Sequence, residues 1–167
     1  MNDLAHWRRT MDTAMILTQE PFDPSRQGWV PDHEVGFMQI AGPAWQRRDG
    51  QTLRLGLLTG DRHANRNGVV HGGVILALID HGLGMISLDR TGCSRQATIS
   101  LNVQFVSPAI MGDFLELDAD VIRQTRSIVF LRGTLRAGSR VVATADGIWK
   151  ILDSQRRQPI VEDRTPA

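Results

Sequence analysis

The 167-residue chain has one cysteine, no tyrosine, five phenylalanines and four tryptophans. The single cysteine, Cys93, excludes an intramolecular disulfide framework and a zinc cluster built from thiolates. So few aromatic rings argue against a base-stacking platform for single-stranded nucleic acid. Excess charge of one sign is also missing, because 19 Lys and Arg oppose 18 Asp and Glu, a net charge of +1. We therefore expect no basic surface that binds nucleic acid.

Targeting and membrane-spanning patterns are lacking as well. The first residues do not show the basic-then-apolar pattern of a signal peptide. The most apolar stretch, Val69 to Leu88, contains His71, Asp80 and His81, which makes it too polar to predict a transmembrane helix. These absences favour a soluble, cytoplasmic protein with no membrane partner.

What is present is an ordinary globular composition, with 41% hydrophobic and 22% charged residues. Its length suits one domain with extensions at both ends. We predict an N-terminal helix and irregular connection over 1–32, a folded domain over 33–152 and a C-terminal tail over 153–167. The N-terminal helix is expected over 3–19, where apolar residues recur at helical spacing, and prolines follow it.

The folded domain begins with patterns typical of two strands and a helix. Strands are expected over 34–44 and 51–58, joined by a turn at 47–50 that contains an Asp-Gly pair. A helix is expected over 73–88. It is apolar nearly all round, which indicates burial on several sides. Gly82 and Gly84 inside it suggest a close approach to a sheet or another helix.

The rest of the domain alternates apolar and polar residues in four runs, around 99–105, 115–121, 129–135 and 141–149. This period of two is typical of antiparallel strands with one face on a core. The predicted fold class is therefore α+β: an antiparallel sheet, its last four strands a meander, wrapped around one long helix.

The sequence His71-Gly72-Gly73 lies where a loop becomes the long helix. Glycines allow a ligand to approach the backbone, and the first N–H groups of a helix have no internal partner. A thioester or ester carbonyl directed at the Gly72 or Gly73 N–H would be polarised there. A tight turn without chemistry explains the same glycines equally well.

Asp80 is the unusual residue of the long helix, because its neighbours are apolar. A buried carboxylate is costly unless it is paired or solvated. One interpretation is structural, with Asp80 paired with His81 or capping another element. The other is functional, with Asp80 as a general base or nucleophile that faces a cleft.

The spacing Asn65-x2-Gly68-x2-His71-Gly72-Gly73-x6-Asp80, followed by a strand that ends at Ser107-Pro108, resembles the signature of the hotdog-fold acyl-CoA thioesterases. The resemblance is to the PaaI-like, phenylacetate-degradation branch and covers about 35–152. It implies a hotdog fold and the hydrolysis of an acyl-CoA thioester to a free acid and coenzyme A. It implies no metal and no further cofactor.

The resemblance also implies roles for individual residues. Asp80 would activate the hydrolytic water or attack directly, and the Gly72 N–H would polarise the thioester carbonyl. Asn65 would help orient the water or the carbonyl, and Thr98 would help place the water. His71 would hold the loop rather than act as a base.

Two further segments match those that line the coenzyme A site in the family. The residues implied in substrate binding are Gly73, Phe105, Val106, Ser107, Pro108, Ala109, Arg123, Gln124, Thr125, Arg126 and Ser127. Arg123 and Arg126 suit phosphate recognition. Ordinary solvated hairpin charge is an equal alternative for both.

Other chemistries find little support. The remaining histidines show no metal-ligand spacing, Cys93 has no base partner, and no serine has a Gly-x-Ser-x-Gly setting. The alternative to an enzyme is a non-catalytic acyl-CoA-binding hotdog module. A hotdog dehydratase is disfavoured, because the catalytic patterns of those branches are missing. The acyl group stays open between aromatic, medium-chain and long-chain.

We expect the active site to be shared between two chains. Eight residues of helix separate Gly72 from Asp80, about 12 Å at ~1.5 Å per residue. One thioester cannot lie at both residues of the same helix. An antiparallel partner helix would place Asp80 of one chain beside Gly72 of the other. The expected assembly is a homodimer, and a tetramer as a dimer of dimers.

Overall fold

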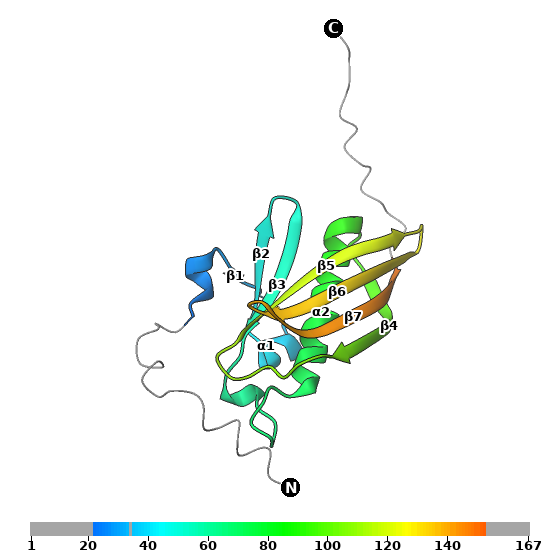
Figure 1. Ribbon diagram of the computed structural model, residues 1–167. Helices are drawn as coiled ribbons and strands as arrows, with labels where there is room; N and C mark the ends of the chain where they lie inside the picture. The colour runs from blue at the N-terminus through cyan, green and yellow to red at the C-terminus, as the bar shows by residue number, and fades with distance from the viewer. Residues whose placement is uncertain (1–21, 34, 153–167) are drawn as a thin grey trace.

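The computed structural model describes residues 22–33 and 35–152. Seven antiparallel strands form one curved sheet in the order β1-β2-β3-β5-β6-β7-β4, and the long helix α2 lies along its concave face (Figure 1). The helix predicted over 3–19 and the tail over 153–167 lie outside the described residues. The elements are η1 (Pro24–Gln27), β1 (Val30–Pro31), α1 (Phe37–Ala41), β2 (Ala44–Asp49), β3 (Thr52–Leu58), η2 (Asp61–His63), α2 (Gly72–Thr91), β4 (Gln96–Phe105), β5 (Phe114–Gln124), β6 (Ile128–Ala137) and β7 (Arg140–Ile151).

Helix α2 confirms the long helix expected over 73–88 and extends it at both ends. It ends at Gly92, which has a left-handed φ of 63° and donates its N–H to the Leu88 carbonyl at 2.9 Å. Glycine is the usual residue at this position, because a Cβ disfavours that conformation. The Asp80 side chain lies near the middle of this 20-residue helix.

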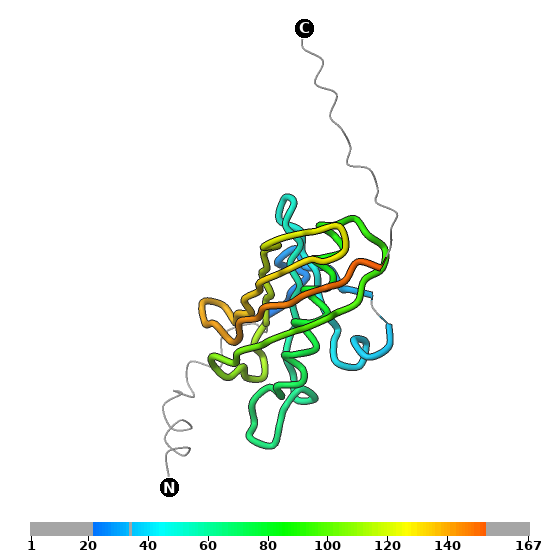
Figure 2. Tube along the Cα trace, turned by 90° about the vertical axis from the view of Figure 1, so that its right-hand side faces the viewer, coloured from blue at the N-terminus to red at the C-terminus, as the bar shows by residue number. Residues whose placement is uncertain are grey.

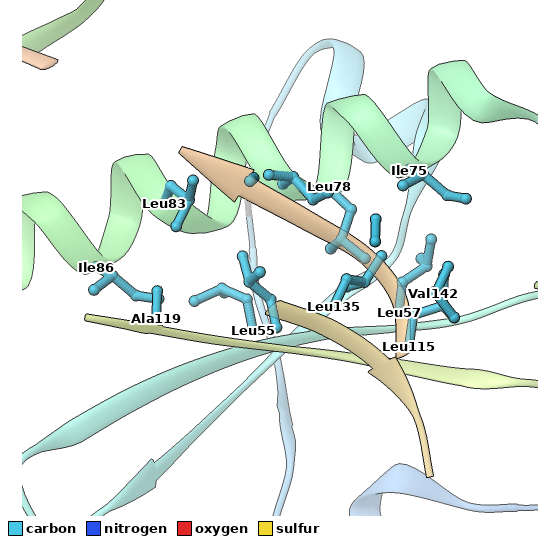
Figure 3. Close-up of a cluster of buried hydrophobic side chains, with 14 of the residues drawn as sticks. Leu55, Leu57, Ile75, Leu78, Leu83, Ile86, Leu115, Ala119, Leu135 and Val142 are labelled. Carbon is cyan, nitrogen blue, oxygen red and sulfur yellow. The ribbon is translucent and has the colours of Figure 1, made fainter. Parts of the chain in front are cut away.

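The core lies between one face of α2 and the concave face of the sheet (Figure 3). Leu78 and Leu83 from α2 and Leu55 from β3 are fully buried. Burying each such side chain contributes about 1.5–3 kcal/mol. The close approach expected at Gly82 is confirmed, because a Cβ there would lie 2.4 Å from the Leu117 side chain.

The sheet covers one face of α2, and α1 and β4 contact it as well, but part of its surface stays uncovered. Leu76 is 41% exposed on the uncovered face. By length and composition alone α2 could cross a membrane, a test that the core helix of a soluble protein also passes. Since a core helix is normally covered, the uncovered apolar face around Leu76 indicates contact with another molecule.

The prediction of a strand over 34–44 is wrong. Gly36 has a left-handed φ of 68°, and the chain then forms the short helix α1. Pro43, which has no N–H for a ladder, follows the helix, and the strand begins only at Ala44. It continues to Asp49, so the turn of the β2–β3 hairpin lies at Gly50 and Gln51.

The four later strands are confirmed, but the meander is wrong. β5, β6 and β7 are consecutive neighbours, whereas β4 pairs with β7 and β5 pairs with β3. The alternation in a sequence predicts a strand and its faces but not its neighbour. The crossover leaves β4 at the edge of the sheet, beside β7 (Figure 2). No other described strand pairs with the outer edge of β4.

Candidate active site

The N-terminus of α2 presents one free backbone donor. His71 is the N-cap residue, and its Nδ1 accepts the Gly73 N–H at 2.9 Å. The Val74 N–H donates to the His71 carbonyl at 2.9 Å. The Gly72 N–H has no acceptor among the described residues. Of the two N–H groups that could polarise a carbonyl, the structure therefore leaves Gly72 available and uses Gly73 in the cap.

The loop before α2 is held by its own hydrogen bonds. The Asn65 side-chain oxygen accepts the N–H groups of Asn67 at 2.8 Å and Val69 at 3.4 Å. The His71 N–H donates to the His63 carbonyl at 2.7 Å. Because the Asn65 oxygen serves the loop, any contact of this side chain with a substrate would come from its NH2 group.

His63 is a buried link between this loop and α1. Its Nδ1 accepts the Gly60 N–H at 3.0 Å, and its surface is 3% exposed. Burial lowers the pKa of His63 below its usual 6.5, and the positive charge of Arg62 lowers this pKa further. A hydrogen bond with the Ala41 backbone acts in the opposite direction. The ring is therefore neutral at pH 7.

Asp80 lies on the partly exposed flank of α2 that faces β4. The Thr98 hydroxyl donates to Asp80 Oδ1 at 3.0 Å, so the structure brings together two residues predicted for the site. The expected alternative, a pair between Asp80 and His81, does not form. The single hydroxyl partner leaves most of the acceptor capacity of the carboxylate unused.

His81 instead pairs with Asp32, a residue that the sequence did not single out. His81 Nε2 lies 2.8 Å from Asp32 Oδ2, and the two side chains are 12% and 7% exposed. The Asp32 N–H donates to the Ala44 carbonyl at 2.9 Å. The sequence carries no signal for this pair, since 49 residues separate its members.

The turn after β4 lies against the N-terminus of α2, as the prediction for Phe105, Val106, Ser107, Pro108 and Ala109 requires. A Cβ on Gly72 would lie 3.4 Å from the Phe105 ring. The Val70 N–H donates to the Ala109 carbonyl at 2.8 Å, and Ser107 Oγ donates to the Val141 carbonyl at 2.5 Å. Phe105 itself is 54% exposed beside the free Gly72 N–H.

The hairpin with Arg123, Gln124, Thr125, Arg126 and Ser127 lies elsewhere. Thr125 Oγ1 accepts the Ile128 N–H at 2.9 Å, which closes the turn. Both arginines are exposed. Strand β5 is 11 residues long and separates this hairpin from the turn after β4 by about 35 Å, at ~3.3 Å per residue. One subunit alone therefore does not bring these two predicted coenzyme A segments together.

A cavity of about 620 Å³ opens on the other face of the sheet and holds none of the predicted site residues. Ion pairs cross it: Arg54 NH1 lies 2.5 Å from Glu116, and Arg47 NH2 lies 3.6 Å from the same carboxylate. Over residues 22–33 and 35–152, no group of three His, Cys, Asp or Glu side chains could hold a metal ion.

Comparisons with known proteins agree with this fold. The model of the thioesterase superfamily matches residues 67–144, from the loop before α2 into β7. A Pseudomonas aeruginosa protein named "Putative esterase PA0474" is 31% identical over 117 residues, which are 69% of this chain and 87% of that protein. Human acyl-coenzyme A thioesterase 13 is 27% identical over 70 residues, 42% of this chain and 50% of that protein.

Solved structures show the same architecture. The PaaI protein from the phenylacetic acid degradation operon of E. coli superimposes with a TM-score of 0.64 at 16% identity, over 71% of this chain and 86% of that one. The fold is thus the hotdog fold of the thioesterases, with one long helix against an antiparallel sheet. The chain belongs to the thioesterase superfamily.

Proposed function

We propose that this protein hydrolyses an acyl-CoA thioester to a free acid and coenzyme A, at a site shared between two subunits. The observation that carries the proposal is the contact between Thr98 and Asp80, 3.0 Å long on a partly exposed flank of α2. It presents a carboxylate with free acceptor positions beside a hydroxyl. This pair can hold and deprotonate a water molecule that attacks the thioester carbonyl.

The second requirement is a donor for the oxyanion that forms when the water adds. The free Gly72 N–H, at the positive end of the α2 dipole, is such a donor. The new C–O bond forms as the carbonyl electron pair moves to oxygen. Asp80 takes one proton from the attacking water. Collapse of the intermediate breaks the C–S bond and expels the coenzyme A thiolate, which takes that proton from Asp80 and leaves as the free thiol.

Asp80 and Gly72 of one chain lie about 12 Å apart along α2, at ~1.5 Å per residue. A second copy resolves this distance when its α2 runs antiparallel to the first. Two features support such a partner: the free edge of β4, ten residues long, and the uncovered apolar face of α2. A two-fold axis beside β4 would extend the sheet and cover that face.

The coenzyme end is part of the same proposal. The exposed side chains Arg123 and Arg126 would meet the phosphates of a coenzyme A bound mainly by another subunit, since about 35 Å at ~3.3 Å per residue separates them from their own turn at Phe105. Replacing either arginine by alanine should raise KM for acyl-CoA and leave KM for the matching acyl-pantetheine unchanged. Equal changes for both substrates would contradict phosphate recognition.

The test is thiol release from a panel of acyl-CoAs by wild type and three variants. Gly72→Pro removes the N–H and preserves the backbone path, because proline is favoured at the first helical position and His71 already has the extended conformation that precedes proline (φ −64°, ψ 133°). It also adds a ring near Phe105. Gly72→Ala keeps the N–H and is the matched control.

Asp80→Asn should reduce kcat by orders of magnitude. Gly72→Pro should reduce kcat by about a hundredfold, as the loss of one oxyanion donor does elsewhere. Gly72→Ala should stay close to wild type. A wild-type protein that binds acyl-CoA and releases no thiol would favour the acyl-CoA-binding module instead.

A further inference from the structure

Helix α1 contributes no buried side chain, yet both of its ends are fixed by glycine. Gly36 precedes it with a left-handed φ of 68°. Gly42 follows it, and a Cβ there would come within 2.6 Å of the Met38 carbonyl oxygen and 2.5 Å of the Ala44 nitrogen. Both backbone positions require glycine, so the path of the chain into and out of α1 is narrowly defined.

Two histidines, buried His63 and largely enclosed His81, contact the same segment. His81 on α2 pairs with Asp32 at 2.8 Å, before α1. His63 is 3% exposed and interacts with the backbone of Ala41, the last residue of α1. A helix that adds nothing to the core is thus positioned by both glycine conformations and buried polar contacts. Such support is typical of an element that holds a binding surface in place.

The surface that α1 presents is apolar and uncharged. Val35, Phe37 and Ile40 are 79%, 66% and 74% exposed. Single exposed apolar residues need no explanation, but three on one short, rigid segment indicate a binding surface. We call Val35, Phe37 and Ile40 the α1 surface.

The α1 surface lies across α2 from Asp80, on the flank that carries His81. Figures 1 and 2 show α1 against the first half of α2, and the two helices are in contact. His81, which pairs with Asp32 before α1, directly follows Asp80 in the chain. Between the two flanks and next to Asp80, α2 carries the small residue Ala77, over which a ligand could cross the helix.

We propose that the α1 surface binds the acyl chain of the substrate, and that His81 and Asp32 are positioning residues for it. The proposal rests on the proposed thioesterase function. The acyl chain is the apolar part of an acyl-CoA, whereas the coenzyme end carries phosphates that an uncharged surface would not attract. The α1 surface is not the proposed dimer contact. The second copy is assigned to the edge at β4, whereas β1, next to Asp32, lies at the opposite edge of the sheet.

This assignment predicts a preference for longer acyl groups. To cross α2, an acyl chain must be about as long as the helix is wide, ~10 Å with side chains. An acetyl group ends near the reacting carbonyl, while a decanoyl group reaches the α1 surface. Each methylene that the surface removes from water strengthens binding by about fourfold.

The experiment compares kcat/KM for decanoyl-CoA and acetyl-CoA. The variants are Phe37→Ser, Ile40→Ser and His81→Gln, with Val30→Ser as the control, because Val30 is also exposed (55%) but lies on β1. Phe37→Ser and Ile40→Ser should each lower kcat/KM for decanoyl-CoA by about tenfold and change that for acetyl-CoA by less than about twofold. His81→Gln should act in the same direction, and Val30→Ser should match wild type.

An unchanged ratio of decanoyl to acetyl activity in Phe37→Ser and Ile40→Ser would overturn the proposal. So would equal losses on both substrates together with a smaller mass by sedimentation, since α1 would then be a subunit interface. If wild type hydrolyses neither substrate, the proposed function fails, and calorimetric binding of decanoyl-CoA decides this inference separately. Weaker binding by Phe37→Ser supports the acyl surface, and unchanged or absent binding overturns it.

Discussion

Asp80 and His81 are adjacent in the chain but serve different flanks of α2. Asp80 faces β4, at one edge of the sheet, and has a neutral hydroxyl partner on a partly exposed surface. His81 faces Asp32, next to β1 at the opposite edge, in a pair that is nearly enclosed. The comparison teaches that one flank keeps a carboxylate accessible, as the proposed chemistry requires, while the polar contact on the other flank holds the segment before α1 against α2.

The strongest effect is expected from Asp80→Asn. The amide keeps the shape and can still accept the Thr98 hydrogen bond, but it cannot take a proton from water. We expect kcat to fall by about a thousandfold or more, while the free energy of unfolding changes by less than about 0.5 kcal/mol because the site is partly exposed. Steady-state thiol release and urea unfolding measure the two effects. A large loss of stability would mean that Asp80 belongs to the structural flank.

His81→Gln should show the opposite pattern. It leaves the Asp32 carboxylate enclosed without its ring partner, and removing one member of a buried pair costs about 3 kcal/mol. The unfolding midpoint in urea measures this loss. Asp32→Asn in the same background provides the control, since it removes the stranded charge and should recover part of the stability. If the double variant is no more stable than His81→Gln, the pair is not the source of the effect.

Thr98→Val should have a smaller effect, confined to catalysis. Valine preserves the shape and removes the hydroxyl that donates to Asp80 at 3.0 Å. A hydrogen bond to a charged group contributes about 1.5–3 kcal/mol, so kcat should fall by roughly ten- to a hundredfold. Thr98→Ser retains the hydroxyl and should remain near wild type. Equal kcat values for the valine and serine variants would remove Thr98 from the mechanism.

The smallest effect concerns the pH dependence of stability and His63, the buried histidine behind the loop before α2. Burial, together with Arg62, holds the folded pKa below the unfolded value of about 6.5. The unfolded chain therefore binds the proton more readily, so the contribution to stability is complete above pH 6.5 and is lost as the pH falls through that value toward the lower folded pKa. Urea unfolding between pH 7.5 and pH 5.5 should show this decline, and His63→Gln should flatten it. A slope unaffected by His63→Gln would assign the decline to other groups.

The sequence predicted the start of α2 and the position of Asp80 better than the elements around them. The start of α2 at His71-Gly72-Gly73 follows from local helix chemistry, and the proximity of Asp80 and Thr98 follows from the resemblance to the PaaI-like thioesterases, whereas the N-cap role of His71 comes from the structure. The α1 segment was mistaken for a strand, because alternating apolar residues outweighed the effect of Gly36 and Pro43. The neighbours of β4 and the partner of His81 depend on contacts between distant residues, for which a single sequence carries no signal.

The shared site is the central claim, and mixing two inactive variants tests it most directly. Asp80→Asn and Gly72→Pro are unfolded together, refolded and assayed for thiol release. In a mixed dimer with shared sites, one site carries both substitutions and the other carries neither, so random pairing restores roughly a quarter of all sites. The account predicts activity near a quarter of wild type, with each variant alone inactive. No recovery, in a mixture that sedimentation shows to be dimeric, would place each site within one chain and contradict the account.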